Sequence, residues 1–167
     1  GGGARGCEGG SGARGVEAGR YTRWHKRVAG GDGGGGGGEG PGAGQTHGQN
    51  SENAPVEETE LNCPVRIDGL SLVEDSDGPG RFRGGLGLRK DFLFDRPTTF
   101  TVLADRTVRG PRGALGGEDG RTAEYVLIRD GGETRLSATT TIEVEAGETI
   151  SLRTCGGGGD GPTSEGG

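Results

Sequence analysis

Glycine constrains this chain more than any other residue. Of its 167 residues 42 are glycine, and 21 of these fall within residues 1–48. Only 27% of the chain is apolar, so little side-chain surface is available to offset the entropy of ordering the backbone. We therefore expect residues 1–44, which include the tract GGDGGGGGGEGPGAG (30–44), to be disordered and low in complexity, and the core to begin near residue 55.

From about residue 61 onward, apolar residues alternate with polar ones, which is typical of half-buried strands. The dipeptide DG at 68–69 shifts the phase of this alternation, and RDGGE (129–133) has the glycines of a hairpin turn. The sequence predicts a mainly β fold, with seven or eight short antiparallel strands in a sandwich or meander. Residues 45–162 would form this domain and residues 163–167 a tail. The alternating positions are Val65, Ile67, Leu70, Leu72, Leu86, Leu88, Phe92, Phe94, Phe100, Val102, Ile142, Val144, Ile150 and Leu152.

Charge and apolar content exclude two classes of partner. Residues 49–167 carry 13 basic against 21 acidic side chains, so the predicted folded part is acidic and unsuited to general nucleic-acid binding. No apolar stretch approaches the roughly 20 residues of a membrane span. We therefore expect a protein with neither nucleic acid nor membrane as its partner.

The cysteines indicate a reducing compartment. Cys7, Cys63 and Cys155 lie far apart, and their odd number without a CxxC pair favours reduced thiols in a cytoplasmic protein. Cys63 and Cys155 would then act as small apolar residues rather than as nucleophiles. The chain begins with glycine rather than methionine, and we expect it to be a piece of a longer protein.

The stretch GPGRFRGGLGLRK (78–90) invites two functional interpretations, and both fail. In a P-loop a serine or threonine follows the lysine, whereas Lys90 is followed by Asp91 and no helix pattern comes after it. An RNA-binding RGG tract repeats many times in a basic setting, whereas this motif occurs once in an acidic one. The glycines are better explained by a structural role, either at positive φ or where two backbones approach closely.

Four blocks of the chain then resemble, in order, segments of one family. These blocks are QTHGQNSENAPVE (45–57), GRFRGGLGLRKDFLF (80–94), LADRTVRGPRGALGGEDG (103–120) and the closing GGETRL…TCGGGGDGP (131–162). They are similar to the hydantoinase B/oxoprolinase family, the B-type subunits of ATP-dependent 5-oxoprolinases and N-methylhydantoinases, with relatives among acetone and acetophenone carboxylases. Asp160 stands where the family has an aromatic residue, and Cys155 stands where it has proline.

The resemblance implies the C-terminal part of a much longer subunit. The complete enzyme would hydrolyse the C–N bond of a cyclic amide, 5-oxoproline or a hydantoin, at the expense of ATP. It would need ATP, bound by an A-type partner subunit or domain, and a divalent metal, bound by the missing N-terminal part of its own subunit. No catalytic or metal-binding residue is assigned in this chain, no cofactor is expected in it, and the isolated chain would be inactive.

Two groups of candidate residues remain. A polar group would help to shape a substrate pocket completed by the missing part, or would form a loop whose asparagines cap turns: His47, Asn50, Asn53 and Glu57. A second group belongs to the glycine-rich motifs and has a structural role: Arg81, Arg83, Gly84, Gly85, Gly87, Gly156, Gly157 and Gly158. The run GGGGDGP (156–162) is either a backbone nest for an anion or, as we expect without an aromatic neighbour, a mobile tail.

Two alternatives stay open beside the enzyme fragment. One is a non-catalytic β-rich module with a glycine-rich tail that binds a protein or nucleic acid. The other is a non-functional product of a truncated gene.

Overall fold

The computed structural model describes residues 8–17, 20–29, 33–35, 38–40, 42, 65–104 and 106–163. These residues form strands and no helix, and no helical segment among them has the length and apolar character needed to cross a membrane. The strands are β1 (Glu8–Glu17), β2 (Arg20–Ala29), β3 (Val65–Val73), β4 (Gly87–Phe94), β5 (Thr98–Leu103), β6 (Glu124–Arg129), β7 (Gly132–Arg135), β8 (Thr139–Val144) and β9 (Thr149–Arg153).

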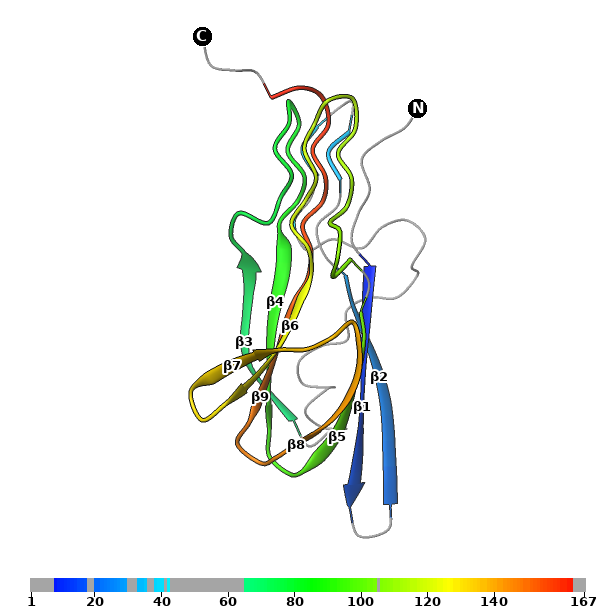
Figure 1. Cartoon of the computed structure of the whole chain (residues 1–167), viewed down its shortest axis with the longest axis vertical. Coiled ribbons are helices and arrows are strands. Elements are labelled where there is room, and N and C mark those ends of the chain that lie inside the picture. The colour runs from blue at the N-terminus through cyan, green and yellow to red at the C-terminus, as the bar shows by residue number, and fades with distance from the viewer. Residues whose placement is uncertain are drawn as a thin grey trace.

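The strands form two antiparallel sheets that share one core. One sheet has the order β2-β1-β5-β8 and the other β3-β4-β9-β6-β7. The chain passes from one sheet to the other after β4, through residues 95–97, and again after β8, through residues 145–148. In Figure 1 the strands occupy the lower part of the molecule, and extended segments run side by side above them. The predicted mainly β fold is confirmed, in its sandwich form.

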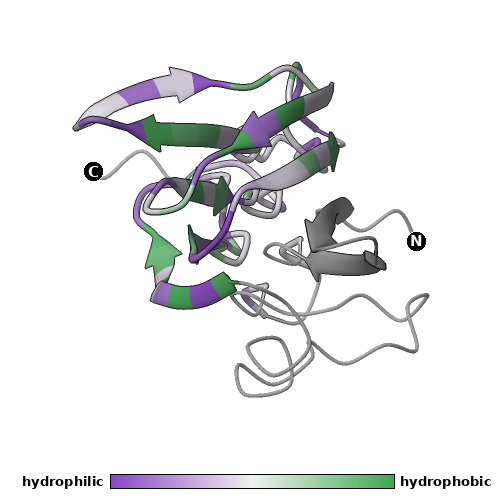
Figure 2. Cartoon of the chain, turned by 90° about the horizontal axis from the view of Figure 1, so that it is seen from below, coloured by the Kyte–Doolittle hydropathy of each residue, from purple (hydrophilic) through white to green (hydrophobic). Residues whose placement is uncertain are grey.

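The core is filled by alternate side chains of both sheets. Phe94 of β4 meets Phe100 of β5 edge to face, with ring centroids 5.9 Å apart, so that these two rings join the sheets. Strands in Figure 2 accordingly carry both hydrophilic and hydrophobic residues, as half-buried strands do. The alternation after residue 61 is therefore borne out at the buried core positions Val65, Phe92, Phe94, Phe100, Val102, Val144, Ile150 and Leu152.

The predicted change of phase at 68–69 is a β-bulge. The register of β3 against β4 shifts between Ile67 and Gly69. The bulge returns Leu70 and Leu72 to the phase of Lys90 and Leu88, their partners on β4. These two leucines are nevertheless 58% and 48% exposed, because β3 is the edge of its sheet and has a neighbour on one side only.

The hairpin turn that the sequence indicated has the expected geometry. Asp130 and Gly131 connect β6 to β7, and both have positive φ, at 50° and 77°, as a two-residue hairpin of the primed type requires. The loop at 145–148 contains four residues, with Gly147 at a φ of 88°. Because the loop has an even number of residues, even-numbered residues point into the core on both sides of it: Val144 of β8 and Ile150 of β9. The two strands nevertheless belong to different sheets.

Two segments of the N-terminal region, for which we expected disorder, are strands in the structure. Residues 8–17 and 20–29 form β1 and β2, which pair with each other, and β1 also pairs with β5. β2 contains tyrosine, threonine, tryptophan and valine, all of which favour strands. A two-stranded hairpin alone is marginal in water, and β5 supplies the third strand that it needs. Composition alone could not reveal that partner.

Candidate functional site: the glycine stack and the polar cavity

Three glycine-rich segments lie side by side above the sheets, and we call them the glycine stack. They are residues 76–87, 110–121 and 155–161, with residues 33–35 alongside (Figure 1). None is a regular strand, yet backbone hydrogen bonds hold them together. Three of the four blocks that resemble the family therefore meet in one structure. The fourth, with its candidate residues His47, Asn50, Asn53 and Glu57, lies outside the described residues.

The segment 155–161 is the centre of the glycine stack. It accepts or donates backbone hydrogen bonds on several sides: Gly78 N–H to Gly157 O (2.8 Å), Gly157 N–H to Gly85 O (2.9 Å), Gly34 N–H to Gly158 O (2.9 Å), Ala114 N–H to Gly159 O (2.9 Å) and Asp160 N–H to Phe82 O (2.8 Å). Every residue from 155 to 160 is buried. The expectation of a mobile tail at 156–162 is therefore wrong.

Side chains are excluded from the stack because neighbouring backbones are in contact. A Cβ atom on Gly156 or Gly159 would overlap the carbonyl oxygens of Ser76 and Pro79, respectively. These two glycines are three residues apart and face the same neighbouring segment. Three residues per turn is the period of a polyproline II-type helix, and in bundles of such helices only glycine fits at crowded positions.

The RGG motif takes part in this packing through its first glycine. A Cβ on Gly84 would overlap the carbonyl oxygen of Gly157, and one on Gly87 that of Thr154. Neither glycine has positive φ. Close backbone approach, rather than a left-handed conformation, is therefore the physical reason for glycine here.

Two buried hydroxyl groups join the glycine stack to the sheet below it. The Ser76 hydroxyl donates to Val73 O (2.6 Å) and accepts from Gly87 N–H (2.8 Å). The Thr154 hydroxyl accepts from Leu88 N–H (2.7 Å). Both side chains are almost fully buried, and each satisfies a backbone group at the point where a strand becomes a stack segment.

The arginines of the RGG motif lie on the outside of the glycine stack. The Arg83 Nε donates to the Asp77 carboxylate at 2.6 Å, and the Arg81 guanidinium stacks over the Phe82 ring, 5.5 Å from its centroid. Arg89 forms an ion pair with Asp91. Within the described part, the contacts of these arginines are therefore with neighbouring residues of the chain.

A polar cavity of about 410 Å³ lies where the outer face of the five-stranded sheet, β3-β4-β9-β6-β7, meets the glycine stack. Its lining includes Ser71, Arg89, Arg153 and Glu124, which form one row across four neighbouring strands. Arg121 completes the charged lining from the stack side. Two arginines that face each other across β4 and β9 repel, so the arrangement requires carboxylates beside them.

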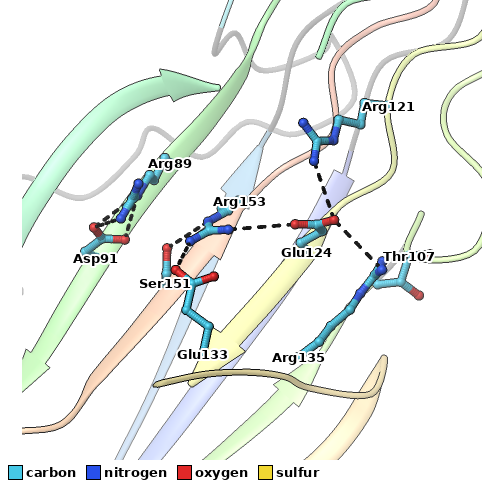
Figure 3. A network of polar contacts seen from close by, with 9 residues as sticks. All are labelled: Arg89, Asp91, Thr107, Arg121, Glu124, Glu133, Arg135, Ser151 and Arg153. Atoms are coloured by element: carbon cyan, nitrogen blue, oxygen red, sulfur yellow. Dashed lines mark hydrogen bonds and ion pairs between the residues drawn. The ribbon is translucent and has the colours of Figure 1, made fainter. Parts of the chain in front are cut away.

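Figure 3 shows how these charges are neutralised. Arg153 lies 2.8 Å from the Glu133 carboxylate and 3.9 Å from that of Glu124. Glu124 is also within 3.7 Å of Arg121 and 3.8 Å of Arg135. Glu124 is thus a shared counter-ion for three arginines that come from the stack and from both neighbouring strands.

Arg89 and Asp91 form the tightest pair beside this cavity. The Arg89 Nε and Nη2 both donate to the Asp91 carboxylate, at 3.1 and 2.8 Å. This hydrogen bonding raises the pKa of Arg89 above its usual range, so the guanidinium stays charged at every accessible pH. The pair fixes Arg89 against the sheet, where Ser151, fully buried, lies in the next row.

The polar cavity is lined by side chains that form ion pairs and hydrogen bonds within the chain. Its lining offers guanidinium, carboxylate and hydroxyl groups and contains no cysteine, histidine or lysine that could activate a hydroxyl nucleophile. Among the described residues no three His, Cys, Asp or Glu side chains lie together as metal ligands. This part of the chain therefore does not fit a divalent metal, and we assign it no metal-dependent step.

The oxidation state of Cys155 differs from the one expected from the sequence. Cys155 is fully buried beside the core and forms a disulfide, whereas reduced thiols were expected. Its partner lies outside the described residues, as do Cys7 and Cys63, the two other cysteines of the chain. Cysteine spacing along the sequence could not indicate this pairing.

The sequence interpretation missed the ion network and the buried Asp160. Glu124 and Arg153 stand at outward-facing positions of strands whose inward-facing positions are apolar. The alternation of polar and apolar residues could therefore have indicated that both side chains lie on the outer face of the sheet. Asp160 is 4% exposed, and its Oδ1 has no hydrogen-bond partner among the residues that the structure describes. No sequence signal marks Asp160 as buried, because its burial depends on the two other segments of the glycine stack, residues 76–87 and 110–121.

Comparisons with known proteins agree with this architecture. The family model for hydantoinase B/oxoprolinase matches residues 3–163. The 5-oxoprolinase 1 of Arabidopsis thaliana is 35% identical over 139 residues, which are 83% of this chain and 11% of that protein. The chain thus spans about a tenth of the length of this relative.

Two solved structures share the fold. An ATP-dependent caprolactamase from Pseudomonas jessenii superposes with a TM-score of 0.75 at 21% identity, over 93% of this chain and 30% of the other. A nucleotide-free acetone carboxylase gives a TM-score of 0.74 at 15% identity, over 92% of this chain and 25% of the other. Since the family model covers nearly the whole sequence, this chain belongs to the hydantoinase B/oxoprolinase family.

Proposed function

We propose that this chain is the glycine-stack part of a subunit that hydrolyses a cyclic amide, 5-oxoproline or a hydantoin, with the help of ATP. The named relatives include a 5-oxoprolinase and an ATP-dependent caprolactamase, and both names denote enzymes that act on a lactam. The chain itself would not turn over substrate. Its role would be to hold a rigid, side-chain-free end of the fold in place for the rest of the subunit.

The observation that carries this proposal is the convergence of the family-like blocks in the glycine stack. Three blocks far apart in the sequence interlock through backbone hydrogen bonds and glycine contacts. The likeness to the family therefore concerns a packing arrangement, and the three arginines of the polar cavity already have carboxylates of this chain as partners. Such a part supports the chemistry of other residues, which would lie outside this chain together with the sites for ATP and metal.

The partners of this chain would be the remaining part of its own subunit and an A-type subunit or domain that binds ATP. The small share of each relative that the chain spans supports the first partner. Both 5-oxoproline and hydantoin are used as substrates in the test.

The test is a chimera. This chain replaces the matching segment of the Arabidopsis 5-oxoprolinase, and ATP-dependent opening of 5-oxoproline and of hydantoin is measured. We expect the chimera to be active, the Gly158→Ala chimera to lose activity, and the Gly132→Ala chimera to retain it. The purified chain alone, given ATP and either substrate, is expected to release no phosphate. Turnover by the isolated chain would contradict the proposal, as would a folded chimera that is equally active with Gly158→Ala.

A further inference from the structure

Several arginines of the described part differ in whether they form an ion pair with a carboxylate. Seven of them form ion pairs with carboxylates: Arg66, Arg83, Arg89, Arg121, Arg129, Arg135 and Arg153. Arg106, Arg109 and Arg112 form none with any described residue, and all three lie in the segment that joins β5 to β6. The whole chain carries 25 acidic residues against 19 basic ones, so a shortage of carboxylates does not explain why these three remain without one.

These three arginines line one hollow, which we call the arginine hollow. Its volume is about 640 Å³, and Asp119 and Thr122 contribute to its wall. The Asp119 carboxylate accepts a hydrogen bond from Gly113 N–H at 3.0 Å, so part of its capacity is already used. The wall has three positive charges and one negative charge, in a volume within the range of about 300–1,000 Å³ that is common for small-molecule sites.

The backbone of the same segment adds further donors. The N–H groups of residues 107–110 donate to no acceptor among the described residues. Arg106 has a φ of 58°, a left-handed conformation that is uncommon for a residue other than glycine, asparagine or aspartate. Its carbonyl is fixed by Ala123 N–H at 2.9 Å. Backbone held in such a conformation is found most often at binding and active sites.

We propose that the arginine hollow binds the oxyanion group, a phosphate or a carboxylate, of a small organic molecule. Guanidinium groups match both oxyanions through paired hydrogen bonds, and the Thr122 hydroxyl and the free N–H groups add single ones. Val108, 87% exposed in the wall of the hollow, offers apolar contact to the carbon skeleton of the ligand.

The neighbouring polar cavity shows the contrast that supports this assignment. Both spaces include Thr122 in their lining. In the polar cavity Arg89, Arg121 and Arg153 have carboxylates of the chain itself as counter-ions. In the arginine hollow the counter-ions are left for a ligand to supply. This inference goes beyond the proposed function, and it is tested by binding rather than by turnover.

The test is a titration of the isotope-labelled full chain followed by amide NMR. The probes are inorganic phosphate, methyl phosphate and glutarate, with chloride used to hold the ionic strength constant. We expect saturable shifts of the amide signals of residues 107–110 and Thr122 at millimolar probe. The more tightly bound probe identifies the source of the oxyanion: phosphate esters if the phosphates win, carboxylic acids if glutarate does.

Two variants make the test specific. Combined Arg109→Gln and Arg112→Gln should weaken binding at least about tenfold, because two charge-assisted contacts are lost. Arg66→Gln, which removes an exposed arginine paired with Asp95 outside the hollow, should leave affinity within about twofold. If the double variant is unfolded by circular dichroism, Arg106→Gly replaces it, since glycine accepts the positive φ of that position.

Two results would overturn the proposal. One is the absence of saturable shifts with every probe, which would leave the hollow to another occupant such as an acidic protein surface. The other is an equal loss of affinity in the Arg66→Gln control, which would show non-specific attraction to a charged surface.

Discussion

The sandwich and the glycine stack are packed by opposite means in one chain. In the sandwich, side chains from two sheets fill the space, as Phe94 and Phe100 do where they meet edge to face. In the stack, backbones touch each other, and a single Cβ at Gly156 or Gly158 would overlap a carbonyl oxygen. The first region is stabilised by burial of apolar surface, and the second by backbone hydrogen bonds in a space without side chains.

This difference teaches that hydropathy reports on only one kind of interior. Residues 155–160 are as buried as the core, although they comprise one cysteine, four glycines and one aspartate. A segment with no apolar pattern can therefore be the inside of a fold when other backbones surround it. The two regions should also respond differently to the same chemical change, and that expectation can be measured.

The largest effect is expected from removing a ring of the sandwich core. Phe100→Ala deletes a side chain that is 1% exposed and should lower the free energy of unfolding by about 3–5 kcal/mol. Urea unfolding of the purified chain measures it. Leu103→Ala, on the same strand but 58% exposed, should change stability by less than about 0.5 kcal/mol. Similar losses in both variants would mean that the sandwich core is not organised as described.

Adding one methyl group to the glycine stack should be the next most costly change. A Cβ on Gly158 would overlap the carbonyl oxygen of Arg112, so Gly158→Ala should destabilise by about 1–3 kcal/mol. In Gly132→Ala the new Cβ would stand 3.4 Å from Arg129 O, which is ordinary contact, and stability should be unchanged or slightly raised. Urea unfolding of both variants decides the matter, and equal stabilities would refute close backbone packing.

Removing an unsatisfied group from the glycine stack should raise stability. Asp160→Ala deletes a buried carboxylate whose Oδ1 has no partner within the described part of the chain. It should stabilise the chain by about 1–3 kcal/mol, since such groups retain their desolvation cost. The control is Asp119→Ala, which removes an exposed acceptor of the Gly113 N–H bond and should destabilise slightly. A loss of stability in Asp160→Ala would show that the carboxylate has a partner in solution.

The smallest effect is expected for the ion pair between Arg129, at the end of β6, and Glu148, in the loop at 145–148. Hydrogen bonds from Arg129 lower the pKa of Glu148 below its usual value of 4.5, although burial opposes this. A lowered folded-state pKa stabilises the protein above pH 4.5, and this contribution is lost as the pH falls through the folded-state pKa.

Thermal unfolding against pH tests this linkage. Glu148→Gln should flatten the fall in Tm on the acid side, and Arg129→Gln should flatten the same part of the profile. Profiles as steep as that of the original chain would rule out the linkage. No comparable change is expected from Gly132→Ala, which leaves both charged groups in place.

Much of the sandwich could be predicted from the sequence, because its rules are local. The period of two identified Phe92, Phe94, Ile150 and Leu152 as core residues, and the glycines of RDGGE identified a hairpin. Leu70 and Leu72 were given the correct phase, but their exposure could not be foreseen, because phase does not reveal which strand lies at an edge.

The candidate site was predictable only in part. Glycine at 84 and 87 suggested close backbone approach, which the structure shows, whereas the burial of residues 156–160 depends on segments more than thirty residues away. The same holds for Cys155, whose disulfide joins distant parts of the chain. Long-range contacts between backbones leave no periodic pattern in the sequence, so they cannot be predicted from residue pattern and composition.

The position of residues 155–161 at the centre of the glycine stack has a consequence for biosynthesis. They are the last of the three stack segments to leave the ribosome, whereas residues 76–87 and 110–121 emerge first. Until the last segment arrives, donors such as Gly78 N–H and Ala114 N–H lack the oxygens of Gly157 and Gly159 that they meet in the finished fold. β9, which lies between β4 and β6 in the five-stranded sheet, directly precedes this segment in the chain. Completion of that sheet and of the glycine stack must therefore both wait for translation of residues 149–161.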